Sequence, residues 1–163
     1  MVKKTKVVKK LKTLDMELAL ADYFDFRQSL IVPNISWGLH IHECDMLVLT
    51  KAGYAYEIEI KVSLSDLKND AKKQHKHQSK LISKLYFAIP EHLEKNIEHI
   101  PDKAGIIIVK KHPRNGRVFC VKLRESTITT KYKFDDAQRY QMARLGTMRI
   151  WSLKKSIKKL KKV

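Results

Sequence analysis

One stretch, from Tyr56 to Ser63, constrains the fold of this chain more than any other part of the sequence. It reads Tyr-Glu-Ile-Glu-Ile-Lys-Val-Ser, so charged and apolar side chains alternate with a period of two, as is typical of a β-strand. The alternation predicts a half-buried strand with Glu57, Glu59 and Lys61 on one face and the apolar residues between them on the other.

A second strand is predicted upstream, over residues 41–50, with Glu43 and Asp45 on a shared face. Only a short glycine-containing turn separates the two strands, and this spacing predicts an antiparallel hairpin. If the polar faces of the two strands coincide, Asp45 meets Glu59 and Lys61.

These side chains suit the hydrolysis of phosphodiester bonds. Asp45, Glu59, Glu43 and the backbone carbonyl of Ile60 offer the hard oxygen ligands that Mg²⁺ or Mn²⁺ prefers. Such an ion lowers the pKa of a bound water and neutralises charge on the phosphate, while Lys61 orients the water or contacts the phosphate. The pattern therefore favours a metal-dependent phosphodiesterase site.

Two further carboxylates are candidates for the same site. Glu57 shares a face with Glu59, and the Glu-x-Lys spacing favours Glu59 as the ligand. Glu17 lies in the first turn of a helix predicted over residues 13–27, where a carboxylate complements the helix dipole. For Glu17 we weigh a solvated helix start against an accessory catalytic role, and neither is preferred.

The charge of the chain points to an anionic polymer as its partner. Lys and Arg number 34 against 17 Asp and Glu, which gives a formal net charge of +17 at pH 7. Residues 1–12 and residues 154–163 each carry lysines and no acid. We expect a basic N-terminal arm, one domain over 13–153 and a basic C-terminal tail, and favour phosphate contact over mere solvation for the two basic ends.

The two cysteines, Cys44 and Cys120, lie far apart and lack the spacing of a metal site. Their number fits a reducing compartment and gives no support to structural zinc. No signal peptide or transmembrane run is recognised in the sequence. We therefore expect no membrane partner and a cytoplasmic protein, associated with the nucleoid if the chain is bacterial and in the host cytoplasm if it is encoded by a phage.

A basic helix is predicted after the Glu-x-Lys strand. Ser63-Leu64-Ser65-Asp66 has the form of a capping box, and the helix is expected to run to about Ser83. On this helix, side chains that can contact the nucleic-acid backbone are Lys68, Lys72, Lys73, Gln74, Lys76 and Gln78. Phosphate contacts of this kind predict binding with little base specificity.

The remaining elements complete an α/β sandwich with a mixed central β-sheet flanked by helices. Strands are predicted over residues 29–32, 84–90, 105–109 and 118–121, and helices over 91–98 and 135–152. Candidate core residues are Leu14, Leu18, Ala21 and Phe24 in the first helix and Tyr140, Ala143, Leu145 and Trp151 in the last.

The motif and its order resemble those of the PD-(D/E)xK nuclease superfamily. Asp45 is followed by Glu59-Ile60-Lys61, then by a helix and a buried strand. The proline that precedes the first Asp in the superfamily is replaced by Cys44. The wider pattern, which continues through Asp70 and Lys72 to the strands near 85–90 and 104–108, resembles the MmcB-like branch associated with DNA repair.

This resemblance, over about residues 14–110, implies a restriction-endonuclease-like α/β/α core and a Mg²⁺ or Mn²⁺ cofactor. It implies Asp45, Glu59 and Lys61 as the catalytic set, with Glu17 beside the metal. The expected function is a metal-dependent DNA nuclease in repair, recombination or replication. The alternatives are a noncatalytic basic nucleic-acid-binding protein and a dimeric Holliday-junction-resolving enzyme of the same superfamily, so DNA is the expected partner and a homodimer stays open.

Overall fold

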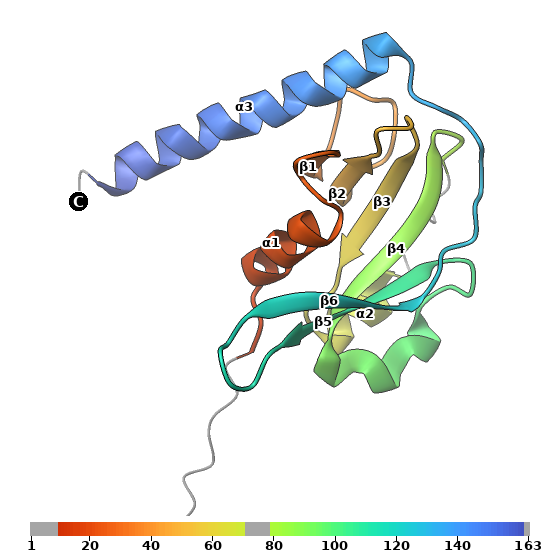
Figure 1. Cartoon of the computed structure of the whole chain (residues 1–163), viewed down its shortest axis with the longest axis vertical. Coiled ribbons are helices and arrows are strands. Elements are labelled where there is room, and N and C mark those ends of the chain that lie inside the picture. The colour runs from red at the N-terminus through yellow and green to blue at the C-terminus, as the bar shows by residue number, and fades with distance from the viewer. Residues whose placement is uncertain (1–9, 71–78, 162–163) are drawn as a thin grey trace, which may run out of the picture.

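The structure is a computed structural model that describes residues 10–70 and 79–161 and contains a six-stranded β-sheet with helices on both faces (Figure 1). The elements in chain order are α1 (Thr13–Tyr23), β1 (Leu30–Ile35), β2 (Cys44–Leu49), β3 (Ala55–Ile60), α2 (Leu64–Asp70), β4 (Ile82–Pro90), the 3-10 helix η1 (Glu91–His99), β5 (Gly105–Lys111), β6 (Val118–Arg124) and α3 (Asp136–Leu160). No helix in these ranges has the length and apolar character needed to span a membrane.

The six strands lie side by side in the same order as in the chain. β1, β2 and β3 pair antiparallel, β3, β4 and β5 pair parallel, and β6 returns antiparallel along β5. Parallel neighbours need a crossover connection, and the segments that contain α2 and η1 supply the two crossovers. The predicted hairpin and the predicted mixed sheet flanked by helices are both confirmed.

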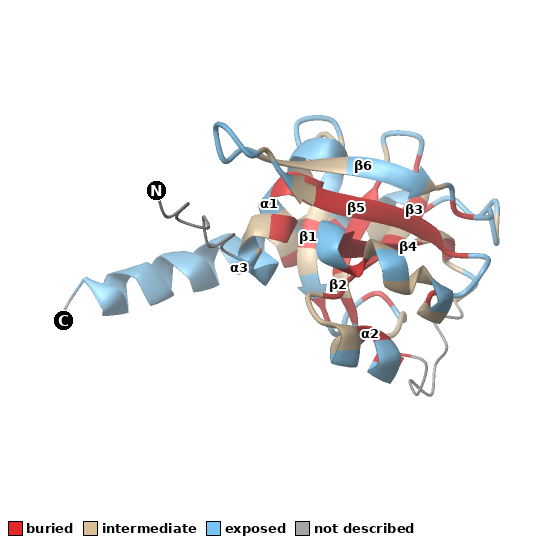
Figure 2. Cartoon of the chain, turned by 90° about the horizontal axis from the view of Figure 1, so that it is seen from below, coloured by how far each residue is buried: buried red, intermediate tan, exposed pale blue. Residues whose placement is uncertain are grey.

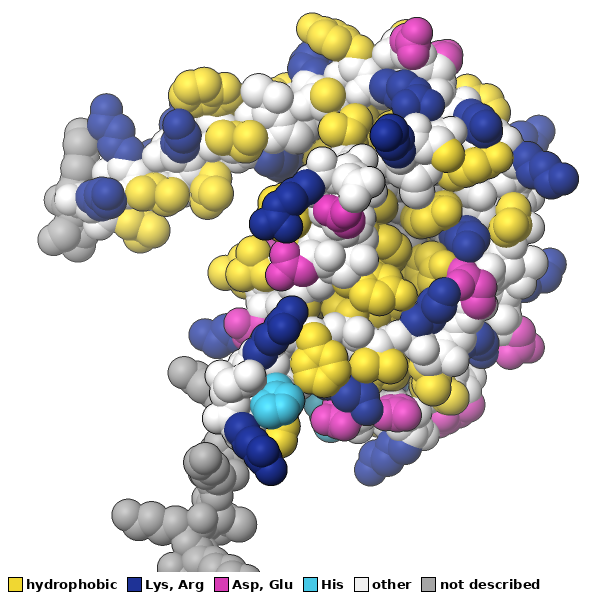
Figure 3. All heavy atoms as spheres, viewed as in Figure 1, with side chains coloured by type: hydrophobic (Ala, Val, Ile, Leu, Met, Phe, Trp, Pro, Cys, Tyr) yellow, Lys and Arg dark blue, Asp and Glu magenta, His cyan; other side chains and the backbone are white. Residues whose placement is uncertain are grey.

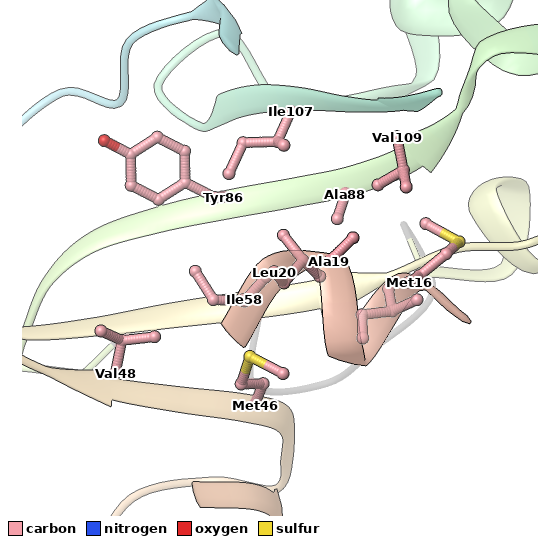
Figure 4. Close-up of a cluster of buried hydrophobic side chains, with 11 residues drawn as sticks. Met16, Ala19, Leu20, Met46, Val48, Ile58, Tyr86, Ala88, Ile107 and Val109 are labelled. Atoms are coloured by element: carbon pink, nitrogen blue, oxygen red, sulfur yellow. The ribbon is translucent and has the colours of Figure 1, made fainter. Parts of the chain in front are cut away.

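One face of the sheet is covered by α1. Met16, Ala19 and Leu20 of this helix pack on the apolar side chains of β2 to β5, among them Ile58 and Ala88 (Figure 4). The predicted stripe was wrong for Leu14 and Leu18, which are 62% and 61% exposed, whereas Phe24 packs against this cluster. α1 has apolar residues on more than one side, and the side that carries Met16 and Leu20 is the one that meets the sheet.

α1 also ends earlier than the expected Arg27. The helix stops at Tyr23, and Asp25 has a φ of 54°, in the left-handed region that interrupts a right-handed helix.

The opposite face is covered by α2, η1 and the first half of α3. Leu67 of α2 and Leu93 of η1 pack on β4 and β5, while Met142 and Leu145 of α3 pack near β1 and β2. β5 is therefore buried along most of its length (Figure 2). Burial on both faces is the normal condition of the parallel part of a sheet.

The predicted C-terminal ends of α2 and α3 were both wrong. The helix after β3 cannot continue to Ser83, because residues 82–90 form β4; within the described residues α2 ends at Asp70. α3 continues past Ser152 to Leu160. Of its predicted core residues, Leu145 is buried, whereas Tyr140 and Trp151 are 72% and 59% exposed, because the sheet contacts the side of the helix that carries Met142.

Candidate active site

A hollow of ≈ 590 Å³ lies where the end of β3 meets the start of β2. Its lining residues are Thr13, Glu43, Cys44, Asp45, Glu59, Ile60, Lys61 and Asp66. All the predicted metal ligands and three of the four predicted catalytic residues therefore line one concave surface. Hairpin pairing brings this about, because residues 15 positions apart in sequence become neighbours at the end of the two strands.

Asp45 is a partly exposed carboxylate of this hollow. Its side chain is 41% exposed, and its Oδ2 accepts a hydrogen bond of 2.7 Å from the backbone amide of Ile60. The same oxygen lies 3.9 Å from Nζ of Lys61. The contact with Ile60 fixes the orientation of the carboxylate at the end of β3.

Lys61 is the buried cation of the hollow, with a side chain only 5% exposed. Its Nζ lies 2.6 Å from Oε2 of Glu59 and 2.9 Å from Oδ1 of Asp70. Burial alone would lower the pKa of the ammonium, but the charges and hydrogen bonds of these two carboxylates outweigh burial and raise the pKa above its ordinary value. Lys61 is therefore held protonated at neutral pH.

The local sequence explains how Asp70 reaches Lys61. The backbone amide of Lys61 donates to the carbonyl of Ala88, so β3 stays attached to β4 beyond its last strand residue. Ser63 then begins α2, and its hydroxyl accepts a hydrogen bond of 3.2 Å from the amide of Asp66. The short helix carries the carboxylate of Asp70 back over Lys61, where it is 7% exposed.

Glu17 approaches the site from α1. Its pKa is raised by burial and, to a smaller extent, by the negative charge of Asp45. The structure thus brings the helix carboxylate into the field of Asp45, on the side of the sheet that α1 covers. Like-charge repulsion between two carboxylates is relieved when a cation binds between them.

Behind the hollow, His42 and Glu57 form a second buried pair. Nε2 of His42 lies 2.8 Å from Oε2 of Glu57, which is fully buried. The prediction of a half-buried strand with an open charged face was therefore wrong: Glu57, Glu59 and Lys61 are all buried. The sequence analysis considered Glu57 only as a competitor of Glu59 and did not anticipate its contact with His42.

The predicted nucleic-acid contacts are only partly within the described structure. Lys68 is exposed on α2, two residues after Asp66, which lines the hollow. The five other predicted residues lie outside the described residues, in 71–78: Lys72, Lys73, Gln74, Lys76 and Gln78.

The donor set fits a hard divalent cation only in part. In the described ranges, no three His, Cys, Asp or Glu side chains are gathered as a ready metal site. Glu59 is engaged by Lys61, whereas Glu43 is exposed and Asp45 and Glu17 are partly exposed. The mutual repulsion of Asp45 and Glu17 is the feature of this site that fits a cation, and carboxylate and carbonyl oxygens are the ligands that Mg²⁺ and Mn²⁺ accept.

Comparison with known proteins gives a family and a fold relative. The SPO1766 protein of unknown function from Silicibacter pomeroyi is similar in structure, with a TM-score of 0.59 and 15% sequence identity over 88% of each chain. That likeness shows the fold alone. No curated protein matches the chain.

The family model described as "DNA repair protein MmcB-like" matches residues 29–156, which include the whole sheet and most of α3. This chain therefore belongs to the MmcB-like family of DNA repair proteins.

Proposed function

We propose that the protein is a metal-dependent DNA nuclease of the PD-(D/E)xK superfamily that acts in DNA repair, recombination or replication. The observation that carries the proposal is the arrangement of Lys61, a buried protonated lysine 3.9 Å from the partly exposed carboxylate of Asp45, in a hollow at the end of β3. Membership of a DNA repair family supports nucleic acid as the substrate.

Lys61 acts as a fixed positive charge in this proposal. A lysine whose pKa is raised is a poor general base, so its role is to orient water or to contact a phosphate oxygen through N–H donation. Glu59 and Asp70 hold the ammonium in place, which makes them positioning residues. A preorganised charge of this kind stabilises the negative charge that develops on the phosphate.

Asp45, Glu17 and the Ile60 carbonyl would hold Mg²⁺ or Mn²⁺, with Glu59 and Glu43 at the margins of the same site. When bound, the ion supplies a water of lowered pKa and neutralises phosphate charge. Asp45 is oriented for this role by the Ile60 amide, whose hydrogen bond leaves the carboxylate at the surface of the hollow.

The DNA would be held mainly through its backbone. Lys68 is exposed on α2 close to the hollow, and the chain carries an excess of 17 positive charges. Phosphate contacts release counterions, so binding should weaken steeply with salt and depend little on base sequence.

A noncatalytic DNA-binding role is the second candidate, and one observation favours it. Glu59 and Lys61, two of the three motif residues, are buried in an ion-paired cluster, as they would be in a purely structural element. The two functions differ in what they require of Asp45: a binder keeps its function when this carboxylate is neutralised, and a nuclease does not.

The test is cleavage of plasmid, single-stranded and four-way-junction DNA in Mg²⁺, Mn²⁺ or EDTA. Asp45→Asn is compared with Asp102→Asn, a matched change at an exposed site in the loop before β5, at the other end of that strand from the active hollow. We expect metal-dependent cutting by wild type and by D102N, a loss of about 100-fold or more in D45N, and retained DNA binding in all three.

Absence of cutting by the wild-type protein on every substrate, with salt-sensitive binding unchanged in both variants, would overturn the nuclease and leave the noncatalytic role. Preference for the four-way junction over linear DNA would identify a junction-resolving enzyme within the same chemistry.

A further inference from the structure

The second half of α3 projects away from the rest of the protein (Figures 1 and 2). The first half is anchored by Met142 and Leu145, which are buried, and every residue from Thr147 to Lys161 is exposed. Since α3 is continuous to Leu160, its projecting half follows the direction of the anchored half. We call residues 147–161 the projecting arm.

The projecting arm carries an apolar stripe with the spacing of a coiled-coil seam. Its members are Ile150, Leu153, Ile157 and Leu160, which are 55%, 61%, 43% and 76% exposed. Intervals of three, four and three residues place all four on one side of a helix. An exposed stripe of this kind marks a surface that packs against another element.

The charges beside the stripe define the chemistry of its partner. No acid occurs in residues 137–163, and Lys154 and Lys161 flank the stripe at positions where coiled coils select their partners by charge. Hydrophobic and basic side chains are interspersed along the arm in Figure 3. Two arms packed on each other would bring lysines together, so the arm requires an acidic partner with an apolar stripe of its own.

The outer side of α1 has these two properties. Leu14 and Leu18 are exposed there, and Ala21 continues their spacing. Asp15 and Asp22 flank this stripe, and the sequence from residue 13 to residue 26 contains no Lys or Arg. α1 is thus an acidic amphipathic helix whose second apolar side nothing in the described residues buries.

We propose that the projecting arm of one copy packs on α1 of a second copy, and that the reverse contact forms at the same time in a two-fold symmetric dimer. Mutual exchange of this kind is a self-complementary interface, the commonest type in homodimers. At 1.5 Å per residue the seam from Ile150 to Leu160 is about 15 Å long, close to the length of α1.

An antiparallel orientation pairs the charges of the two helices. It places Ile157 against Ala21 and Leu160 against Leu18, as in a coiled-coil seam. In this register Lys154 comes beside Asp22 and Lys161 comes beside Asp15.

DNA and an anionic membrane are the competing occupants of the arm. Phosphates would engage the lysines but give no reason for the stripe that contains Leu153 and Ile157. A membrane surface would engage both the stripe and the lysines but would leave the exposed leucines of α1 without a role. The matching α1 surface is what favours a second copy.

The test is sedimentation of the full chain at low and high salt with charge-reversal variants. Lys154→Glu lies beside the seam, and its matched control Lys155→Glu lies on the opposite side of the same helix turn. We expect a dimer in the wild type and in K155E. K154E and Asp22→Lys should each weaken dimerisation about tenfold, because each reverses two symmetric contacts.

Mixing K154E with D22K should restore the dimer, because one interface then pairs the two altered residues with opposite charges and the other interface is wild type. A second test probes the apolar contacts: Ile157→Gln with Leu160→Gln should abolish dimerisation, while Met148→Gln, on the far side of the arm, should not.

Three results would overturn the proposal. They are a monomer at every concentration tested, equal effects of K154E and K155E, and failure of the mixed variants to associate. Sedimentation of the wild-type monomer with vesicles of anionic lipid, or with DNA, in a manner sensitive to K154E but not to D22K, would assign the arm to that ligand instead.

Discussion

Two groups of carboxylates lie in and around one hollow, and they differ in whether a cationic or imidazole side chain contacts them closely. The closed group, Glu57, Glu59 and Asp70, is buried and contacts cationic or imidazole side chains at distances of 2.6 to 2.9 Å. The open group, Asp45 and Glu17, is partly exposed and repels itself enough to contribute to the raised pKa of Glu17. The closed group builds the site, and the open group is left to bind a ligand.

This difference follows from the energetics of buried charge. A carboxylate out of water is tolerated when a cation and hydrogen bonds compensate it, and removal of the cation leaves a large penalty. A partly exposed carboxylate keeps its hydration, so it can exchange water for a metal ion at little cost to the fold. Substitutions in the two groups should therefore separate stability from function.

The largest effect is expected when the closed group loses its cation. Lys61→Met leaves Glu59 and Asp70 buried without their shared partner and should reduce the free energy of unfolding by about 3–5 kcal/mol. Urea denaturation measures this, with Lys68→Met on exposed α2 as a control that should stay within about 0.5 kcal/mol of wild type. A loss below about 1 kcal/mol in K61M would show that the closed group does not support the fold.

A substitution in the open group should leave stability nearly intact. In Asp45→Asn the side-chain carbonyl can still accept the hydrogen bond from the Ile60 amide, so the free energy of unfolding should change by less than about 1 kcal/mol. Addition of Mn²⁺ should raise the melting temperature of the wild type and not that of D45N. Equal stabilisation of both proteins by the ion would place its binding elsewhere.

Removal of the repulsion within the open group should be slightly stabilising. The pKa of Glu17 is raised, so its carboxylate lowers stability as pH rises through that pKa and has no such effect once it is protonated at acid pH. Glu17→Gln should therefore gain less than about 1 kcal/mol at neutral pH without metal, because the group is partly exposed and solvent screens the repulsion. The urea midpoints of the wild type and of E17Q should therefore coincide at acid pH and differ at neutral pH.

The smallest effect is expected from a carboxylate far from both groups. Glu125 is almost unburied, and hydrogen bonds from Lys122, Tyr86 and Lys84 outweigh the small burial and lower its pKa from 4.5 to about 2. Its contribution is present above pH 4.5 and is lost as pH falls through about 2.

Glu125→Gln should thus destabilise the protein at pH 7 by less than about 1 kcal/mol, after screening by solvent, and by less still in strong acid. Urea midpoints at the two pH values measure the difference. A destabilisation in acid as large as that at neutral pH would show that the hydrogen bonds of Glu125 do not depend on its charge.

The hairpin of β2 and β3, and the proximity of Asp45 to Glu59 and Lys61 that it creates, were predictable because they depend on local sequence. Alternation marks β3, the short turn joins it to β2, and antiparallel pairing then brings Asp45 to Glu59 and Lys61 whatever the rest of the fold does. The order of elements likewise indicated a mixed sheet flanked by helices.

Burial of the charged face was not predictable from the same alternation. A strand with an open polar face and a strand with a buried, ion-paired face have the same period of two. They differ in whether another element brings a partner, as α2 does with Asp70 and the segment before β2 does with His42. These partners lie 9 and 15 residues from Lys61 and Glu57, where no local pattern connects them.

The buried side of α1 was hidden for a related reason. Leu14 and Leu18 form one apolar stripe and Met16 and Leu20 form another, so the sequence is consistent with either side facing the sheet. In the structure, the stripe that contains Met16 and Leu20 packs on the sheet. The stripe left outside is one of the two surfaces from which we infer the dimer.

Calorimetric titration of Mn²⁺ into the wild-type protein and into D45N, E17Q and D102N tests the division between the two groups most directly, because it measures binding without relying on catalysis. The account predicts binding to wild type and D102N, with loss in D45N and weakening in E17Q. Binding to D45N that matches wild type, or no binding to any of the four proteins, would contradict it.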